Sequence, residues 1–124
     1  MIHGVGVDLI DERRLGPLAD PLTDPFITKV YTGAEQAEAL ASRNPRRYYA
    51  ERFAAKEALF KALRISGEGV RLNEIETLND EHGAPFIRLY GSLEQRAREL
   101  GIAAIHVSLS NDPPYSTAFV VCEK

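Results

Sequence analysis

The amino-acid sequence predicts an α+β domain in which a mostly antiparallel sheet packs on one long helix. Apolar, β-branched segments lie near both ends of the chain, and one helical pattern of unusual length lies between them. Short, turn-rich connections separate the later strand-like segments, which favours antiparallel pairing. With 124 residues, the chain is expected to form a single domain over residues 1–124.

The first half of the chain is predicted to hold one strand and the main helices. Residues 2–10 are apolar and form the first strand, whereas the proline-rich residues 15–30 predict a loop with one short helical turn. Thr32 and Glu35 have the spacing of a capping box, so a helix is expected over about 33–42. Asn44 and Pro45 then match an N-cap and a first helical residue, which starts the long helix that ends near residue 63.

The second half is predicted to hold four strands and one helix. Residues 66–69 form a glycine-containing loop, and strands over 74–78 and 85–90 flank a turn at 79–83. Ser92 and Gln95 suggest a second capping box, which would open a helix that ends near Gly101. The last two strands, over 104–110 and 116–122, are joined by a loop at 111–114.

Composition excludes several classes of protein. The net charge of −3 argues against a nucleic-acid binder, and no apolar run reaches the roughly 20 residues that span a bilayer. The charges of the N-terminal segment follow its apolar run, which is the wrong order for a signal peptide. A lone Cys122 excludes an internal disulfide and a cysteine-based metal cluster. We therefore expect a cytoplasmic protein without nucleic-acid or membrane partners.

The stretch RFAAKEALFKAL, residues 52–63, carries charges among small and apolar side chains. Helical periodicity places Glu57 on one face with Phe53 and Phe60, and places Lys61 one turn later. One interpretation is a surface pair between Glu57 and Lys61. The other is a partly shielded carboxylate, which needs either Lys61 or a metal ion as its cation.

A second carboxylate, Asp8, lies near the end of the first strand in the sequence GVGVD. An aspartate on a buried strand requires hydrogen bonds or a cation. Mg²⁺ takes one or two protein carboxylates and completes its shell with water and phosphate oxygens. Asp8 and Glu57 therefore suggest a Mg²⁺ site for a ligand that contains a pyrophosphate, with nearby lysines and arginines neutralising the remaining charge.

Three segments together, GVGVDLIDERR, RFAAKEALFKAL and HVSLSNDPPYSTAFVV, resemble the holo-acyl-carrier-protein synthases of the 4′-phosphopantetheinyl transferase superfamily. The segment GAPFIRLYG resembles the turn and strand between the second and third motifs of that family. The resemblance implies the phosphopantetheinyl transferase fold and Mg²⁺-dependent transfer of 4′-phosphopantetheine from coenzyme A to a serine of apo-acyl carrier protein. It also implies release of adenosine 3′,5′-bisphosphate, a role in fatty acid and lipid biosynthesis, and homotrimers with sites at subunit interfaces.

The resemblance also implies roles for individual residues. Asp8 and Glu57 correspond to the metal ligands, Lys61 to a lysine near the phosphates, and His106 to a histidine that is important for activity. Arg14, with its neighbour Arg13, corresponds to the surface that meets the acidic helix of the carrier protein. The residues expected near coenzyme A are Arg52, Lys56, Lys61, Arg64, Gly67, Gly83, Pro85 and His106.

The chemistry requires the carrier serine to attack the β-phosphorus of coenzyme A and to lose its proton. A metal-bound water, Glu57 and Asp8 are all candidate bases, whereas a lysine suits the role of cation or proton donor better. The chain departs from the family after Leu63, because Arg64, Ile65 and Ser66 precede the first glycine of the turn. Two rival functions are a catalytically silent coenzyme A-binding or trimeric interaction protein and a Mg²⁺-dependent hydrolase of nucleotide pyrophosphates.

Overall fold

A computed structural model describes residues 1–15 and 24–124 and confirms the α+β class. Three antiparallel strands, β1 (Ile2–Asp11), β5 (Tyr115–Glu123) and β4 (Ala104–Asp112), form one sheet in the order β1-β5-β4. A separate antiparallel hairpin consists of β2 (Ile75–Asn79) and β3 (Pro85–Leu89). The predicted single sheet is therefore two sheets.

Four α-helices and two short 3₁₀ helices connect the strands in the described part of the chain. The N-cap contacts of Thr32 and Asn44 confirm the two helix starts that the sequence predicted in the first half. The helical elements are η1 (Glu12–Leu15), α1 (Pro25–Val30), α2 (Gly33–Ala41), α3 (Pro45–Leu63), η2 (Leu72–Glu74) and α4 (Gly91–Glu99). None of the helices in residues 1–15 and 24–124 is both long and apolar enough to cross a bilayer.

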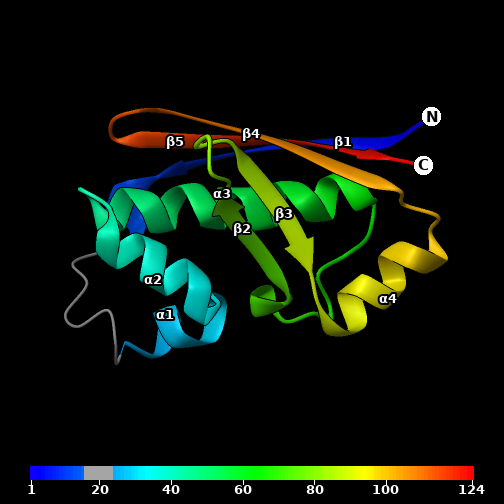
Figure 1. Ribbon diagram of the computed structural model, residues 1–124, viewed down its shortest axis with the longest axis horizontal. Helices are drawn as coiled ribbons and strands as arrows, with labels where there is room; N and C mark the ends of the chain where they lie inside the picture. Colours follow the sequence, from blue (N-terminus) through cyan, green and yellow to red (C-terminus); the bar gives the residue numbers. More distant parts are fainter. Residues whose placement is uncertain (16–23) are drawn as a thin grey trace.

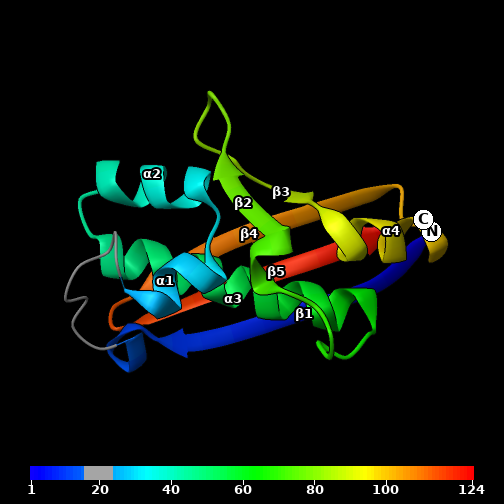
Figure 2. The same ribbon diagram turned by 90° about the horizontal axis from the view of Figure 1, so that it is seen from below.

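The long helix α3 lies across one face of the three-stranded sheet and forms the centre of the molecule (Figure 1). Helices α1 and α2 pack on the other side of α3, and the β2–β3 hairpin lies along the flank of α3 beside β4 (Figure 1 and Figure 2). The two chain termini lie side by side, because Met1 N donates to Lys124 O at 3.1 Å. Within the described part of the chain, no helix covers the opposite face of the three-stranded sheet.

Small residues allow β1 to approach α3 closely. A Cβ atom at Gly4 would lie 2.3 Å from the carbonyl oxygen of Ala62, and one at Gly6 would lie 2.0 Å from that of Ala58. These contacts involve backbone atoms that cannot move aside, so neither position accepts a side chain in this packing. The alanines on this face of α3 are fully buried, which agrees with close packing of the helix on the strand.

One local prediction was wrong. Helix α4 begins at Gly91, and its first turn is capped by a distant residue: the Glu74 carboxylate accepts from Ser92 N at 3.4 Å and from Leu93 N at 3.1 Å. The predicted Ser92–Gln95 capping box is therefore absent. The short helical turn that was expected within 15–30 is present as the six-residue helix α1, while residues 16–23 lie outside the described residues.

Candidate active site

Asp8 and Glu57 lie together at the interface of β1 and α3. Asp8 sits on the side of β1 that faces α3, and its side chain keeps 21% of its surface exposed. Both carboxylates line an open pocket of about 350 Å³, together with Arg14, Phe26 and Phe53. The two acidic residues that the sequence singled out are thus brought together from positions 49 residues apart (57 minus 8).

Lys61 binds to the strand rather than to the neighbouring carboxylate of its own helix. Its Nζ lies 3.5 Å from Asp8 Oδ1 and donates to the carbonyl oxygen of Val7 at 2.8 Å. Among the ion pairs of the described residues, Lys61 has Asp8 as its partner, so the surface pair with Glu57 does not form. Glu57 therefore remains available for another cation.

Asp8 and Glu57 carry two negative charges, and Lys61 supplies one positive charge beside them. Burial raises the pKa of Glu57 above its ordinary value, and the negative charge of Asp8 raises it further, whereas Lys61 opposes the shift. A bound cation between the two carboxylates would relieve this repulsion. The raised pKa therefore marks a place where positive charge is favoured.

We expect the variant Glu57→Gln to be more stable than the parent protein at neutral pH. A raised carboxyl pKa means that the folded state binds the proton more tightly, so wild-type stability falls as pH rises from the ordinary pKa through the raised one. The advantage of the glutamine should therefore be larger at about pH 8 than at about pH 4. Denaturant unfolding without divalent ions measures it; an equal or smaller advantage at the higher pH would contradict the prediction.

The two carboxylates fit a Mg²⁺ ion whose other ligands are water and phosphate oxygens. No group of three or more His, Cys, Asp or Glu side chains suited to a metal occurs in residues 1–15 and 24–124, so the protein offers two carboxylates at this point. Mg²⁺ is commonly held by one or two carboxylates, with water and substrate phosphates as further ligands. Two half-buried carboxylates that repel each other meet this requirement.

The two predicted partner-binding arginines differ in their contacts. Arg14 lines the pocket with Asp8 and Glu57. Arg13 is bound to Asp11 through its Nε and Nη2 atoms, with the shortest contact at 2.6 Å, and these hydrogen bonds lower the pKa of Asp11 to about 2. Arg14 is therefore the better placed of the two to meet an acidic surface beside the carboxylates.

Phe26 was missed from the sequence, because residues 15–30 were interpreted as a loop with one short helical turn whose position was not predicted. It lies in α1, and its ring centroid is 6.1 Å from that of Phe53, which makes an apolar side to the pocket. A local signal existed: Asp24 caps the helix by accepting from Phe26 N at 2.9 Å, and Pro25 follows as the first helical residue.

His106 lies on the uncovered face of the three-stranded sheet and is not brought to the carboxylate pair. Its side chain is 61% exposed, and Nε2 is 2.7 Å from Glu123 Oε1. Because Asp8 faces α3, the two predicted catalytic residues occupy opposite faces of one sheet. Within a single chain they cannot act on the same atom.

The predicted coenzyme A-binding glycines belong to two separate segments. Gly67 follows α3, whereas Gly83 and Pro85 lie in the β2–β3 turn and the start of β3, where Gly83 adopts a φ of 82°. Figures 1 and 2 both place this turn away from the loop after α3. Arg64 is exposed and lies at the end of α3, beside Gly4 of β1.

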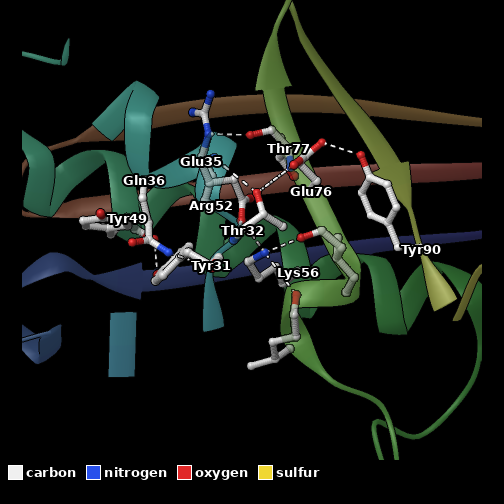
Figure 3. A network of polar contacts seen from close by, with 12 residues as sticks. Tyr31, Thr32, Glu35, Gln36, Tyr49, Arg52, Lys56, Glu76, Thr77 and Tyr90 are labelled. Atoms are coloured by element: carbon white, nitrogen blue, oxygen red, sulfur yellow. Dashed lines mark hydrogen bonds and ion pairs between the residues drawn. The ribbon is translucent and has the colours of Figure 1, made fainter. Parts of the chain in front are cut away.

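Two predicted coenzyme A-binding residues require a correction, because Arg52 and Lys56 are buried on the side of α3 that faces the hairpin (Figure 3). Lys56 is fully buried, and its Nζ donates to Glu35 Oε1 at 2.8 Å and to the carbonyl oxygens of Leu72 and Ile75. Burial lowers the pKa of Lys56, and the Glu35 charge opposes this shift.

Arg52 likewise forms hydrogen bonds with the hairpin. Its Nε donates to Thr77 O at 3.2 Å and its Nη2 to Asn79 Oδ1 at 3.0 Å, and its guanidinium lies 4.1 Å from the Tyr48 ring centroid. With 2% of its surface exposed, Arg52 cannot reach a ligand in this structure. Both residues hold the hairpin and α2 on α3.

Comparison with known proteins relates nearly the whole chain to one protein family. Residues 4–119 match the family model described as the 4′-phosphopantetheinyl transferase superfamily. The chain is 36% identical to the holo-[acyl-carrier-protein] synthase of Halothermothrix orenii over 124 residues, covering 100% of this chain and 99% of that protein. It is 45% identical to the synthase of the same name from Leifsonia xyli subsp. xyli over 125 residues, covering 100% and 98%.

Solved structures agree in fold. The crystal structure of holo-[acyl-carrier-protein] synthase from Neisseria meningitidis matches with a TM-score of 0.90 and 33% identity, over 100% of both chains. A holo-(acyl-carrier-protein) synthase from Bacillus anthracis, described as a complex with CoA (3′,5′-ADP), matches with a TM-score of 0.79 and 29% identity. That match covers 100% of this chain and 98% of the other.

Proposed function

The chain belongs to the 4′-phosphopantetheinyl transferase superfamily, and we propose that it transfers 4′-phosphopantetheine from coenzyme A to a serine of an apo-acyl carrier protein. The relatives that match over nearly their full length bear the name of this activity. The observation that carries the proposal is the meeting of Asp8 and Glu57 in a pocket lined also by Arg14. A metal site for a diphosphate and a cation for an acidic partner protein are thereby adjacent.

Asp8 and Glu57 would hold the Mg²⁺ ion, which supplies positive charge to the diphosphate of coenzyme A when bound. Their position on a strand and on a helix that pack tightly keeps both carboxylates in place. The closely packed contacts of Gly4 and Gly6 with α3 fix the distance between the two elements. Rigid support of this kind preorganises the site for a charged substrate.

Lys61 would supply a second positive charge beside the phosphates. In the reaction, the serine Oγ forms a bond to the β-phosphorus, and the bond to the bridging oxygen breaks. The serine loses its proton, and adenosine 3′,5′-bisphosphate leaves with the electron pair of the broken bond. Lys61 is 57% exposed and anchored to the Val7 carbonyl oxygen, so its ammonium group can stabilise that developing charge without leaving Asp8.

Incubation of the protein with coenzyme A, Mg²⁺ and an apo-acyl carrier protein tests the activity. Intact mass should show the gain of one phosphopantetheine on the carrier, and chromatography should show adenosine 3′,5′-bisphosphate. Release of the bisphosphate without any gain in carrier mass would instead indicate a hydrolase. Binding of coenzyme A without either product would indicate a silent binding protein.

We expect Arg14→Glu to raise the KM for the carrier protein about 10-fold and to change the KM for coenzyme A much less. Reversing a charge at a docking surface repels an acidic partner but leaves the small substrate's contacts intact. Arg98→Glu, on the exposed face of α4, is the matched control and should change neither constant. Equal effects of the Arg14 variant on both KM values would contradict a docking role.

We also propose that the protein acts as a homotrimer in the cytoplasm, in fatty acid and lipid biosynthesis, with a single domain in each chain. The uncovered sheet face supports self-association, because Val5, Val7, Leu9 and Phe119 are each between 46% and 65% exposed there. Contiguous exposed apolar side chains of this kind mark interaction surfaces. A second copy on this face would also bring His106 toward a site, which a single chain does not do.

The variant Phe119→Lys should therefore dissociate the assembly and reduce transfer. A buried, unpaired ammonium group in an apolar interface is strongly unfavourable. Light scattering should give three times the chain mass of 13.8 kDa for the parent protein and a smaller species for the variant. Leu40→Lys, at an exposed apolar residue on α2, controls for added charge. A fully active monomeric parent protein would contradict the trimer.

A further inference from the structure

Arg64 has a backbone conformation that arginine rarely adopts. It is the one non-glycine residue with positive φ in residues 1–15 and 24–124, with φ 63° and ψ 40° at the end of α3. Its N–H donates to Lys61 O at 3.2 Å, and Ile65 N–H donates to Phe60 O at 3.3 Å. This hydrogen-bond pattern ends helices, and the left-handed position in it is usually glycine.

The surrounding structure holds this conformation in place. His3 Nε2 lies 2.8 Å from the carbonyl oxygen of Leu63, so β1 grips the last turn of α3 immediately before Arg64. The Cγ atom of Arg64 lies only 3.2 Å from the position that a Cβ of Gly4 would take. An unfavourable backbone conformation that neighbouring contacts enforce often marks a functional side chain.

The guanidinium of Arg64, like those of several other arginines, is not paired with a carboxylate among the described residues. Arg13, Arg47, Arg52 and Arg98 each form an ion pair with a carboxylate. Arg64 is exposed and takes part in none of the ion pairs found among the described residues. Its positive charge is therefore available to an external anion.

Arg64 lies in line with Asp8 and Lys61 along the face of β1 that packs on α3. The alternate residues of β1 that face α3 include Gly4, Gly6 and Asp8; Arg64 lies over Gly4 and Lys61 over Gly6. Lys61 also contacts Asp8, the third of these residues. Two cations thus extend along the strand from the carboxylate pair, with the spacing of one helical turn.

We propose that Arg64 binds a phosphate group of coenzyme A, and that its strained backbone conformation is retained for this contact. This inference rests on the proposed function, because it takes coenzyme A as the ligand. Coenzyme A carries phosphate at two places, the diphosphate and the ribose 3′ position. Arginine suits either, because its planar donors match the oxygens of a phosphate.

The proposal requires that removing Arg64 makes the protein more stable but a weaker binder of coenzyme A. Arg64→Gly and Arg64→Asn both relieve the left-handed strain and remove the charge, whereas Arg64→Lys keeps a charge. We expect the glycine variant to raise Tm by about 3–6 °C. Calorimetry with Mg²⁺ should show that both uncharged variants bind coenzyme A about 10-fold more weakly, with the lysine variant between them and the parent.

Titration with 3′-dephospho-coenzyme A distinguishes the two phosphate positions. If the variants bind this compound as the parent does, Arg64 contacts the ribose phosphate; if binding weakens equally for both compounds, it contacts the diphosphate. Arg98→Gln is the matched control, because Arg98 is exposed on α4, and it should leave both affinities unchanged.

Two results would overturn the inference. Affinity for coenzyme A within about 2-fold of the parent in both uncharged variants would exclude a phosphate contact. A glycine variant no more stable than the parent would exclude retained strain. Phosphopantetheine transfer is measured separately by carrier mass, so a parent protein that binds coenzyme A through Arg64 but transfers nothing would overturn the proposed function alone.

Discussion

Asp8→Asn and Glu57→Gln are each expected to lower kcat for phosphopantetheine transfer by at least about 100- to 1,000-fold. Both variants keep the size of the side chain but remove one of the two negative charges that would hold Mg²⁺. The two residues line one pocket, and the pKa of Glu57 is raised by burial and by the neighbouring Asp8. Carrier mass against time, over a series of Mg²⁺ concentrations, measures the loss.

A loss of fold would have a different signature from a loss of the metal site. Glu57→Gln should lose activity while remaining as stable as the parent at neutral pH or more so, because it removes a carboxylate with a raised pKa. Mg²⁺ together with coenzyme A should raise the Tm of the parent and not that of the variants. Glu94→Gln, on the exposed surface of α4, is the control. Near-parental turnover in either site variant would refute the metal assignment.

Lys56→Ala is expected to have the largest effect on stability, about 3–5 kcal/mol, because it leaves the Glu35 carboxylate buried without its cation. The side chains of Lys56 and Glu35 are both fully buried, and Nζ lies 2.8 Å from Oε1. A loss of this size is a large part of the total stability of a small domain, so much of the variant should be unfolded near body temperature. Urea unfolding followed by circular dichroism measures the change.

Replacing both members of the buried pair should recover part of this loss. In the double variant Lys56→Met with Glu35→Leu, no charge remains buried, and such apolar replacements are often tolerated. Recovery is expected to be incomplete, because Glu35 also accepts from Thr77 N at 3.0 Å and Lys56 also donates to backbone carbonyl oxygens. The matched control is the exposed pair of Glu94 and Arg98, whose removal should cost less than about 0.5 kcal/mol.

The single variants Lys56→Met and Glu35→Leu, compared with the double variant, give the coupling between the two side chains. A double variant as unstable as the sum of the two singles would show that the ion pair itself contributes little. A Lys56→Ala protein with parental stability would contradict the structural role assigned to this residue, and would restore the possibility that it serves coenzyme A.

Local signals in the sequence predicted most of the fold. Thr32 with Glu35, and Asn44 with Pro45, start their helices as expected, because a cap is made by residues close in the chain. Helix α4 shows the limit of this reasoning: its cap is Glu74, from the other side of the β2–β3 hairpin, and no local pattern reveals such a partner. The division of the strands into two sheets is likewise a matter of long-range pairing.

The candidate site, like the fold, was predicted in part from local sequence patterns and in part depends on tertiary packing. The motifs around Asp8 and Glu57 predicted that these two carboxylates act together, and the structure places both in one pocket. The motif around His106 could not show that this residue lies on the opposite face of the sheet, because strand alternation assigns alternate residues to two faces without saying which face a helix covers.

Lys56 and Lys61 show most clearly the difference between what the sequence determines and what tertiary packing determines. Both lie in the stretch RFAAKEALFKAL, whose composition and periodicity determined a long helix with charges on more than one face. Only the tertiary structure decided that α2 and the β2–β3 hairpin bury Lys56 against Glu35, while Lys61 stays exposed beside Asp8. Periodicity determines which residues share a face of a helix; which face is covered depends on the packing of elements distant in the chain.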